Sequence, residues 1–357
     1  MSGRTGREMK MAFAKFAANS WGVAASVTKG VYFESDAGMQ LRINQVADNA
    51  FGQSFIGPAS NGLVEAPDLT FRGRSRYEDH CYILDALAMG SPAAIAISTS
   101  ANGQVTSWSH VVDLAPSIDG LGATFAIDKV QYVEELTSAK IYGFEESNDD
   151  IGALNVSYRV MGSKPTPISS ININSTVAGA SYPSLGNRVV QQQGVFRMNA
   201  QAGGSLASGD TQVVESVRLT FTRPQDGPHV FGQDYIIEPA DDGWPDAMVE
   251  LTFPRMSTVS ANSLFVGLQA GASSKADWTF TSGLYINSTD AWQKKYQFPY
   301  LQFLPDGFAA NTNGPQQVKP VARFALRLPS AAPTGMSGVV TPIRLTRIMQ
   351  NSVAPFA

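Results

Sequence analysis

The stretch FGQSFIGPASNG, at residues 51–62, occurs a second time in this chain as FGQDYIIEPADDG, at residues 231–243. One residue inserted after Ile236 aligns the two copies, and Phe55 of the first then matches Tyr235 of the second. The likeness continues without a gap over a further block, from Leu69-Thr70-Phe71 against Leu251-Thr252-Phe253 to Ser91 against Ser273. Ordered matches over about forty residues indicate a tandem duplication, which predicts a fold built from one unit used twice.

The composition favours a turn-rich β protein. Hydrophobic residues make up 43% of the 357 residues, charged residues only 16%, and the chain holds 32 Gly and 20 Pro. The net charge of −4 at pH 7 opposes binding to nucleic-acid phosphates, which depends on clustered Lys and Arg. The length and the duplication together predict two domains.

The chain lacks the signals of secretion and of membrane insertion. Cys81 is the single cysteine, so an intramolecular disulfide framework is excluded. No run approaches the roughly eighteen apolar residues that a membrane-spanning helix needs. Arg4 and Arg7 precede an apolar stretch as in a signal peptide, but Lys10 and Lys15 interrupt it, and we expect neither secretion nor a membrane anchor.

The first unit is predicted to span residues 16–165, after an N-terminal arm at 1–15. Residues 6–19 are expected to form one short helix, or an arm that orders only against a neighbour. Asp79 suits the N-cap of a helix over 80–89, and Gly90 its end. A long polar loop at 44–66 carries the first FGQ copy, and strands are predicted from hydrophobic patterning at 31–33, 39–43, 68–71, 93–98, 104–112, 123–128, 132–144 and 153–161.

The second unit is predicted to span residues 184–350, with a tail at 351–357. A Pro- and Gly-containing passage, Gly162-Ser163-Lys164-Pro165-Thr166-Pro167, opens the linker to it, for which we expect residues 166–183. A second helix is expected at 262–270, at the position that matches the first. Strands are predicted at 213–221, 247–253, 278–286, 296–303, 321–328 and around Ile343 and Leu345.

The residues that could carry chemistry do not form a recognisable site. His80, His110 and His229 have no second ligand at metal-site spacing, and the acidic turns at 149–150 and 241–243 lack the spacing of a calcium loop. Glu134-Glu135 and Glu145-Glu146 are adjacent pairs, and adjacent residues of a strand point to opposite faces, so neither pair can flank one glycosidic bond. We therefore expect no catalysis, no metal and no cofactor.

Several stretches resemble the tail tube (major tail) proteins of long-tailed bacteriophages. The resemblance covers most of residues 16–165 in outline, and the second half chiefly through its likeness to the first. Besides the loop at 44–66, it is carried by NSWG (19–22) before KGV (29–31), by DLTFRGRSRYEDHCYILDALAMG (68–90) and by GALNVSYRVMGSKP (152–165).

The resemblance implies a β-sandwich with one flanking helix and a long hairpin loop, used twice in this chain. In that family the inner sheets of six units close into a continuous barrel, and the rings stack into a tube. Two units per chain then imply a homotrimer with a pseudo-hexameric ring. Closure removes exposed sheet edges, and a head-to-tail contact that does not close gives a filament.

The two FGQ loops are predicted to be subunit interfaces, because an apolar group in an otherwise polar loop would be exposed on an isolated domain. The residues we expect to carry the contacts are Phe51, Gly52, Gln53, Phe55 and Ile56 in the first copy and Phe231, Gly232, Gln233, Tyr235 and Ile236 in the second. The alternative is an ordinary long surface loop.

The resulting hypothesis is a structural virion protein located in the tail and assembled in the host cytoplasm. Its expected partners are further copies of itself and the tape-measure, terminator and tip proteins of the tail, with DNA passing through the lumen without specific binding. One alternative is a hexameric tube protein with one tube domain and one decoration domain. Another is a glycan-binding tail component, although the five Trp residues are scattered singly.

Overall fold

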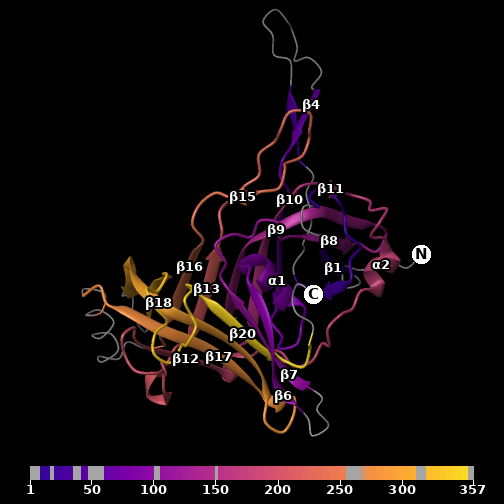
Figure 1. The fold of residues 1–357 in the computed structure, drawn as a ribbon. Helices are drawn as coiled ribbons and strands as arrows, with labels where there is room; N and C mark the ends of the chain where they lie inside the picture. The colour runs from indigo at the N-terminus through magenta and orange to yellow at the C-terminus, as the bar shows by residue number, and fades with distance from the viewer. Residues whose placement is uncertain are drawn as a thin grey trace, which may run out of the picture.

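The computed structural model shows a mainly β chain with large antiparallel sheets (Figure 1). It describes residues 9–16, 20–34, 42–46, 60–99, 105–148, 152–254, 267, 270–310 and 319–352. Below, "first half" and "second half" mean the parts of the chain before and after Thr166, where the Pro-containing linker begins.

The elements of the first half are strands around a single described α-helix. In chain order they are β1 (Lys10–Lys15), β2 (Lys29–Val31), β3 (Ile43–Val46), β4 (Ser60–Val64), β5 (Asp68–Arg74), α1 (Cys81–Met89), β6 (Pro92–Thr99), β7 (Val105–Asp113), β8 (Ala123–Asp128), β9 (Val133–Asn148), β10 (Leu154–Gly162) and β11 (Pro165–Thr166).

The second half begins with a short helix and continues with strands. Its elements are α2 (Asn174–Gly179), β12 (Gly194–Ala200), β13 (Ser216–Thr222), β14 (Gln225–Asp226), β15 (Ala240–Asp241), β16 (Asp246–Thr252), β17 (Ser273–Tyr285), β18 (Ala291–Ala310), β19 (Pro320–Leu326) and β20 (Arg344–Met349), with single 3-10 turns at Gln191–Gln193 and Ser208–Asp210.

Seven neighbouring strands form what we call the central sheet, in the order β5-β10-β9-β13-β16-β19-β18. All of these pairs are antiparallel. Three of the strands come from the first half and four from the second, so the central sheet runs across the division between the halves.

Two long strands, β9 and β18, each share one of their edges between two neighbours. The beginning of β9 pairs with β8, and its end pairs with β13. The beginning of β18 pairs with β20, and its end pairs with β19. Each long strand therefore belongs to the central sheet and to a second group of strands: β2-β1-β8 for β9, and β20-β7-β6 for β18.

The helix α1 lies between the central sheet and the strands β7 and β20. All its residues from Tyr82 to Met89 are buried, which fits a helix that is apolar nearly all round. The prediction of a helix over 80–89 is confirmed, and Gly90 ends it with a φ of 95°. The N-cap is His80 rather than Asp79, but the Asp79 carboxylate still accepts the Cys81 N–H at 3.0 Å.

The expected helix over residues 6–19 is wrong. Lys10–Lys15 form strand β1, which lies between β2 and β8 with its residues Met11 to Ala14 buried. A strand with both faces covered carries apolar residues at successive positions, so its sequence lacks the alternation that marks a half-exposed strand. The second predicted helix, at 262–270, lies outside the described residues except for Gly267 and Ala270.

Candidate assembly surfaces

The two long loops of the chain meet in one protrusion. The β3–β4 hairpin forms one side of it, and residues 228–237 form the other (Figure 1). The Val64 N–H donates to the Asp234 carbonyl at 3.0 Å, and His229 Nε2 lies 2.8 Å from the Val64 carbonyl. The strand β4, which lies within the first long loop, is therefore a neighbour of the loop that carries the second FGQ copy.

A tight turn places Phe231 at the tip of the second loop. The Gln233 N–H donates to the Val230 carbonyl at 3.2 Å, and Gly232 has a φ of 83°. A positive φ at the third residue of a turn requires glycine, as in a type II turn, so the Phe-Gly-Gln sequence specifies this geometry. The Phe231 side chain is fully exposed, at 108% of its reference area.

Buried cations fasten the base of this loop to the first half. Lys140, which is fully buried, donates to the Pro239 carbonyl at 2.5 Å and lies 2.9 Å from the Glu238 carboxylate. Arg223, also buried, binds the Asp241 carboxylate at 3.1 Å and the carbonyl of Ala115 at 2.8 Å. The loop is thus held rigidly at its base, although its tip has no cover.

The predicted interface residues of the second copy differ in their surroundings. Phe231, Gly232 and Gln233 are exposed at the tip, and Tyr235 is half-buried with the Lys164 ammonium 5.4 Å from its ring. Ile236 is buried at 3% exposure, and its carbonyl accepts the Trp21 Nε1–H. The predicted residues of the first copy, Phe51, Gly52, Gln53, Phe55 and Ile56, lie outside the described residues.

A second candidate surface is the polar face of the central sheet, which we call the open face. Along β13, Val217, Leu219 and Phe221 point into the core, whereas Arg218 and Thr220 point outward. Neighbouring strands repeat this alternation, as a sheet with one covered face should. The charged residues of the open face are Asp68, Arg72, Arg74, Glu145, Arg159, Arg218, Asp246, Glu250 and Arg323.

Charges on the open face are arranged in pairs across the strands. Arg218 lies opposite Glu250, which lies opposite Arg323 on the next strand. The Arg218 guanidinium binds Glu145 at 2.7 Å, and the Arg323 guanidinium binds Glu250 at 2.6 Å. The hydrogen bond to Glu145 raises the pKa of Arg218. With five arginines and four carboxylates, the open face is close to neutral.

The covered side of the central sheet holds a network of buried charges that joins the two halves. Arg347 of β20 binds Asp79 at 2.9 Å and Asp85 of α1 at 2.8 Å, and Lys294 of β18 binds Glu146 of β9. Burial opposes the charge of Arg347, but Asp79 and Asp85 outweigh it and raise the pKa of this guanidinium well above its usual value. Burial raises the pKa of Glu146.

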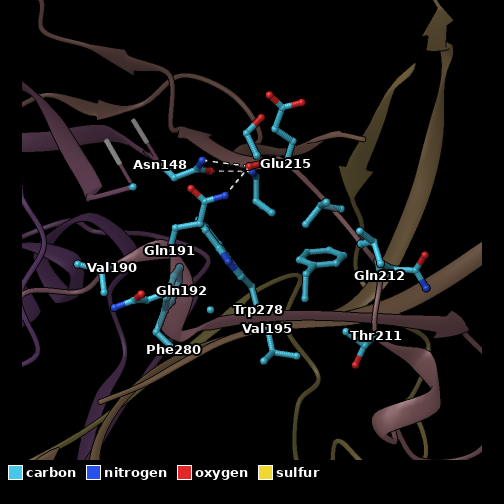
Figure 2. A pocket seen from close by; sticks show the side chains of 17 residues that line it. Asn148, Val190, Gln191, Gln192, Val195, Thr211, Gln212, Glu215, Trp278 and Phe280 are labelled. Carbon is cyan, nitrogen blue, oxygen red and sulfur yellow. Dashed lines mark hydrogen bonds between the residues drawn. The ribbon is translucent and has the colours of Figure 1, made fainter. Parts of the chain in front are cut away.

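A pocket of about 650 Å³ lies between β12, β17 and residues 211–217 (Figure 2). Its polar groups largely satisfy one another, because Gln191 and Asn148 both donate to the Glu215 carbonyl, at 2.7 and 3.3 Å. Trp278 and Phe280 line it but are almost fully buried, so they offer little surface on which a sugar could stack. Glu215 is the one carboxylate among its lining residues, whereas glycoside hydrolysis uses two.

Within the part of the chain that the structure describes, no group of three or more His, Cys, Asp or Glu is placed to hold a metal ion. The described helices are all too short or too polar to cross a membrane. The protrusion and the open face are both exposed to solvent, and their size and shape suit contacts with macromolecules.

No protein-family model matches the sequence, and no curated protein matches it either.

Proposed function

We propose that this chain is a structural subunit of a bacteriophage tail tube, which polymerises as stacked trimeric, pseudo-hexameric rings around a channel for DNA. The proposal rests on the resemblance in sequence and on the two uncovered surfaces. The observation that carries it is the protrusion, where a rigidly anchored loop presents a fully exposed phenylalanine.

An exposed aromatic side chain at the tip of an anchored loop is energetically unfavourable in a monomeric protein. Aromatic side chains supply much of the energy of protein interfaces, and large exposed apolar groups on a soluble chain mark such contacts. The acidic sequence between Pro224 and Asp246, with six carboxylates and no Lys or Arg, keeps the free subunit soluble until it meets its partner.

The width of the central sheet fits the proposed channel. Seven strands spaced about 4.8 Å apart span about 30 Å, so three copies supply about 90 Å of wall. With the strand tilt of a closed barrel, this perimeter corresponds to a channel roughly 30–40 Å across between backbones. Such a channel leaves room for side chains and for a nucleic-acid duplex.

The open face is suited to line this channel. Two of its five arginines, Arg218 and Arg323, are paired with Glu145 and Glu250, so a passing phosphate meets guanidinium groups there that already have a carboxylate partner. A wall of unpaired arginines would hold DNA by releasing its counterions and would slow its passage. A nearly neutral wall allows sliding.

Negative-stain images of the purified full chain test the proposal directly. We expect rings and hollow tubes with threefold symmetry and a sixfold pseudo-repeat. Chains that remain monomeric at every protein and salt concentration tried, or that form aggregates without a lumen, would contradict it. Six copies per ring instead of three would favour the tube-plus-decoration alternative.

A further inference from the structure

Exposed apolar side chains occur at several places on the surface, Ile168, Val213 and Trp244 among them, and two groups of them lie at opposite ends of the molecule. One end is the protrusion, with Phe231, Val230, Leu63 and Ile43. The other end lies at the turn between β17 and β18 (Figure 1). Leu284 and Tyr285, at the end of β17, and Leu185, which lies beside Leu284, are 59–64% exposed. The two ends differ in shape, because the first projects and the second is hollowed.

The hollow at the second end is a groove of about 610 Å³, which we call the end groove. Residues 185–190 form one wall and the end of β17 forms the other, with Leu185, Val190 and Leu284 as its apolar lining. A hydrogen bond of 2.9 Å between Ser282 and Asn187 ties the walls together. The groove is therefore preformed in the subunit.

Two glycines keep the end groove open. A Cβ atom added at Gly283 would meet no atom within 4 Å, and one added at Gly186 would meet only the Ser184 hydroxyl, at 3.7 Å. Neither glycine has a positive φ that would demand its presence. Both residues therefore border open space.

The charges at the two ends are opposite. The protrusion loop carries the exposed carboxylates of Asp226 and Asp234 and no Lys or Arg. The end groove is bordered by the exposed guanidinium of Arg188, beside Arg76. Burial, and after it the like charge of Arg188, lowers the pKa of Arg76.

From these observations we infer that the end groove receives the protrusion of a second copy of this chain, with Phe231 inserted between Leu185 and Leu284. The inference rests on the proposed function and names the partner surface for the stacking contact. Unlike surfaces at opposite ends make a heterologous contact, and such a contact repeats without closing when the ends face apart. Each ring then offers protrusions on one side and grooves on the other.

Two variants with complementary defects test the contact. Phe231→Asp keeps the groove and loses the tip, whereas Leu284→Asp keeps the tip and loses the groove. Both positions are exposed, so circular dichroism and thermal melting should match the unmodified chain. In electron micrographs each variant alone should give single rings. Mixed, they should give two-ring particles and no longer tubes, because only one pairing of surfaces is intact.

A variant that fills the groove supplies a second test without adding charge. Gly283→Val should prevent stacking, since its side chain occupies the space that Phe231 needs. Gly204→Val is the matched control, because a Cβ there also meets nothing within 4 Å and the residue lies outside the groove. The control should form tubes of normal length.

A double variant, Phe231→Cys with Leu284→Cys, tests proximity. Under oxidation it should form disulfide-linked ladders of chains on a denaturing gel, and either single variant should not. The native Cys81 is the partly buried first residue of α1, and burial raises the pKa of its thiol well above the usual value, so it reacts slowly.

The outcomes separate this inference from the proposed function. Tubes of normal length from Leu284→Asp or Gly283→Val, or single rings from the mixture, would overturn the end groove as the receptor and leave tube formation intact. Absence of any ring or tube in the unmodified protein would instead overturn the proposed function.

Discussion

The two faces of the central sheet are made by the same strands, but their charge pairs lie in different environments. Glu145 and Glu146 are neighbours on β9, yet Glu145 binds Arg218 on the open face and Glu146 binds Lys294 in the dry interior. The first pair is partly hydrated, and its replacement should cost little stability. The second leaves a buried charge whenever one partner is lost, so the stability of the fold depends more on the charge pairs of the covered face than on those of the open face.

The largest effect is expected where a buried charge loses its partner. Arg347→Leu leaves the buried carboxylates of Asp79 and Asp85 without this cation and should lower the free energy of unfolding by about 3–5 kcal/mol. Arg323→Leu, on the open face, breaks one partly exposed pair and should cost about 0–1 kcal/mol. Urea unfolding of the two variants measures the difference. Equal losses of free energy of unfolding would contradict the proposed difference between the two faces.

The next largest effect on stability is expected from a comparison of neighbouring residues of β13. Leu219→Ala opens a cavity in the core and should cost about 3 kcal/mol, whereas Thr220→Ala on the open face should stay within about 0.5 kcal/mol. The melting temperatures of the two variants provide the measurement. A costly Thr220→Ala would mean that the open face is packed against something in the folded chain.

A smaller effect on stability, with a clear effect on binding, is expected from removing carboxylates on the open face. Glu145→Gln with Glu250→Gln removes two negative charges beside Arg218 and Arg323, so the salt concentration needed to elute the protein from immobilised DNA should rise. Glu65→Gln with Glu215→Gln changes the net charge equally at other exposed pairs. If both double variants elute together, the open face is not the surface that controls contact with phosphates.

The smallest effect concerns pH and the strands next to α1. Burial lowers the pKa of His110 below its usual 6.5, more than its hydrogen bond to the Asn351 carbonyl raises it. A lowered folded pKa gives stability that is present above the unfolded pKa and lost as the pH falls through the folded value. Urea midpoints should therefore fall on acidification, and fall less in His110→Gln. The same slope in that variant and in His229→Gln on the protrusion would contradict this assignment.

Sequence patterns predicted the parts of the fold that depend on local order. The strand at 123–128 and the helix that begins near Asp79 and stops at Gly90 follow from hydrophobic spacing and capping, and both are confirmed. The argument that Glu145 and Glu146 point to opposite faces is confirmed as well, because it uses only the pleat of a strand. The strand β9 extends four residues beyond the predicted end at 144, into this acidic pair.

The long-range features could not be predicted from the sequence. Charged residues are rarely buried, so no local pattern indicated that Lys140, Arg223, Lys294 and Arg347 would lie inside. The partners of Arg347 are 262 and 268 residues away along the chain. The meeting of the two loops in one protrusion likewise depends on how the halves pair, which the repeated FGQ motif alone does not specify.

The position of β20 beside β7 has a consequence for the timing of folding. Chains are synthesised from the N-terminus, and the strand β20, which completes the packing around α1, is made long after that helix. Until residues 344–349 have been synthesised, α1 is covered on one side only, so the packing of the first half is incomplete. Contacts so distant in sequence form slowly, so the packing around α1 is completed late in folding. A chain truncated before Arg344 lacks β20 and leaves α1 uncovered on that side.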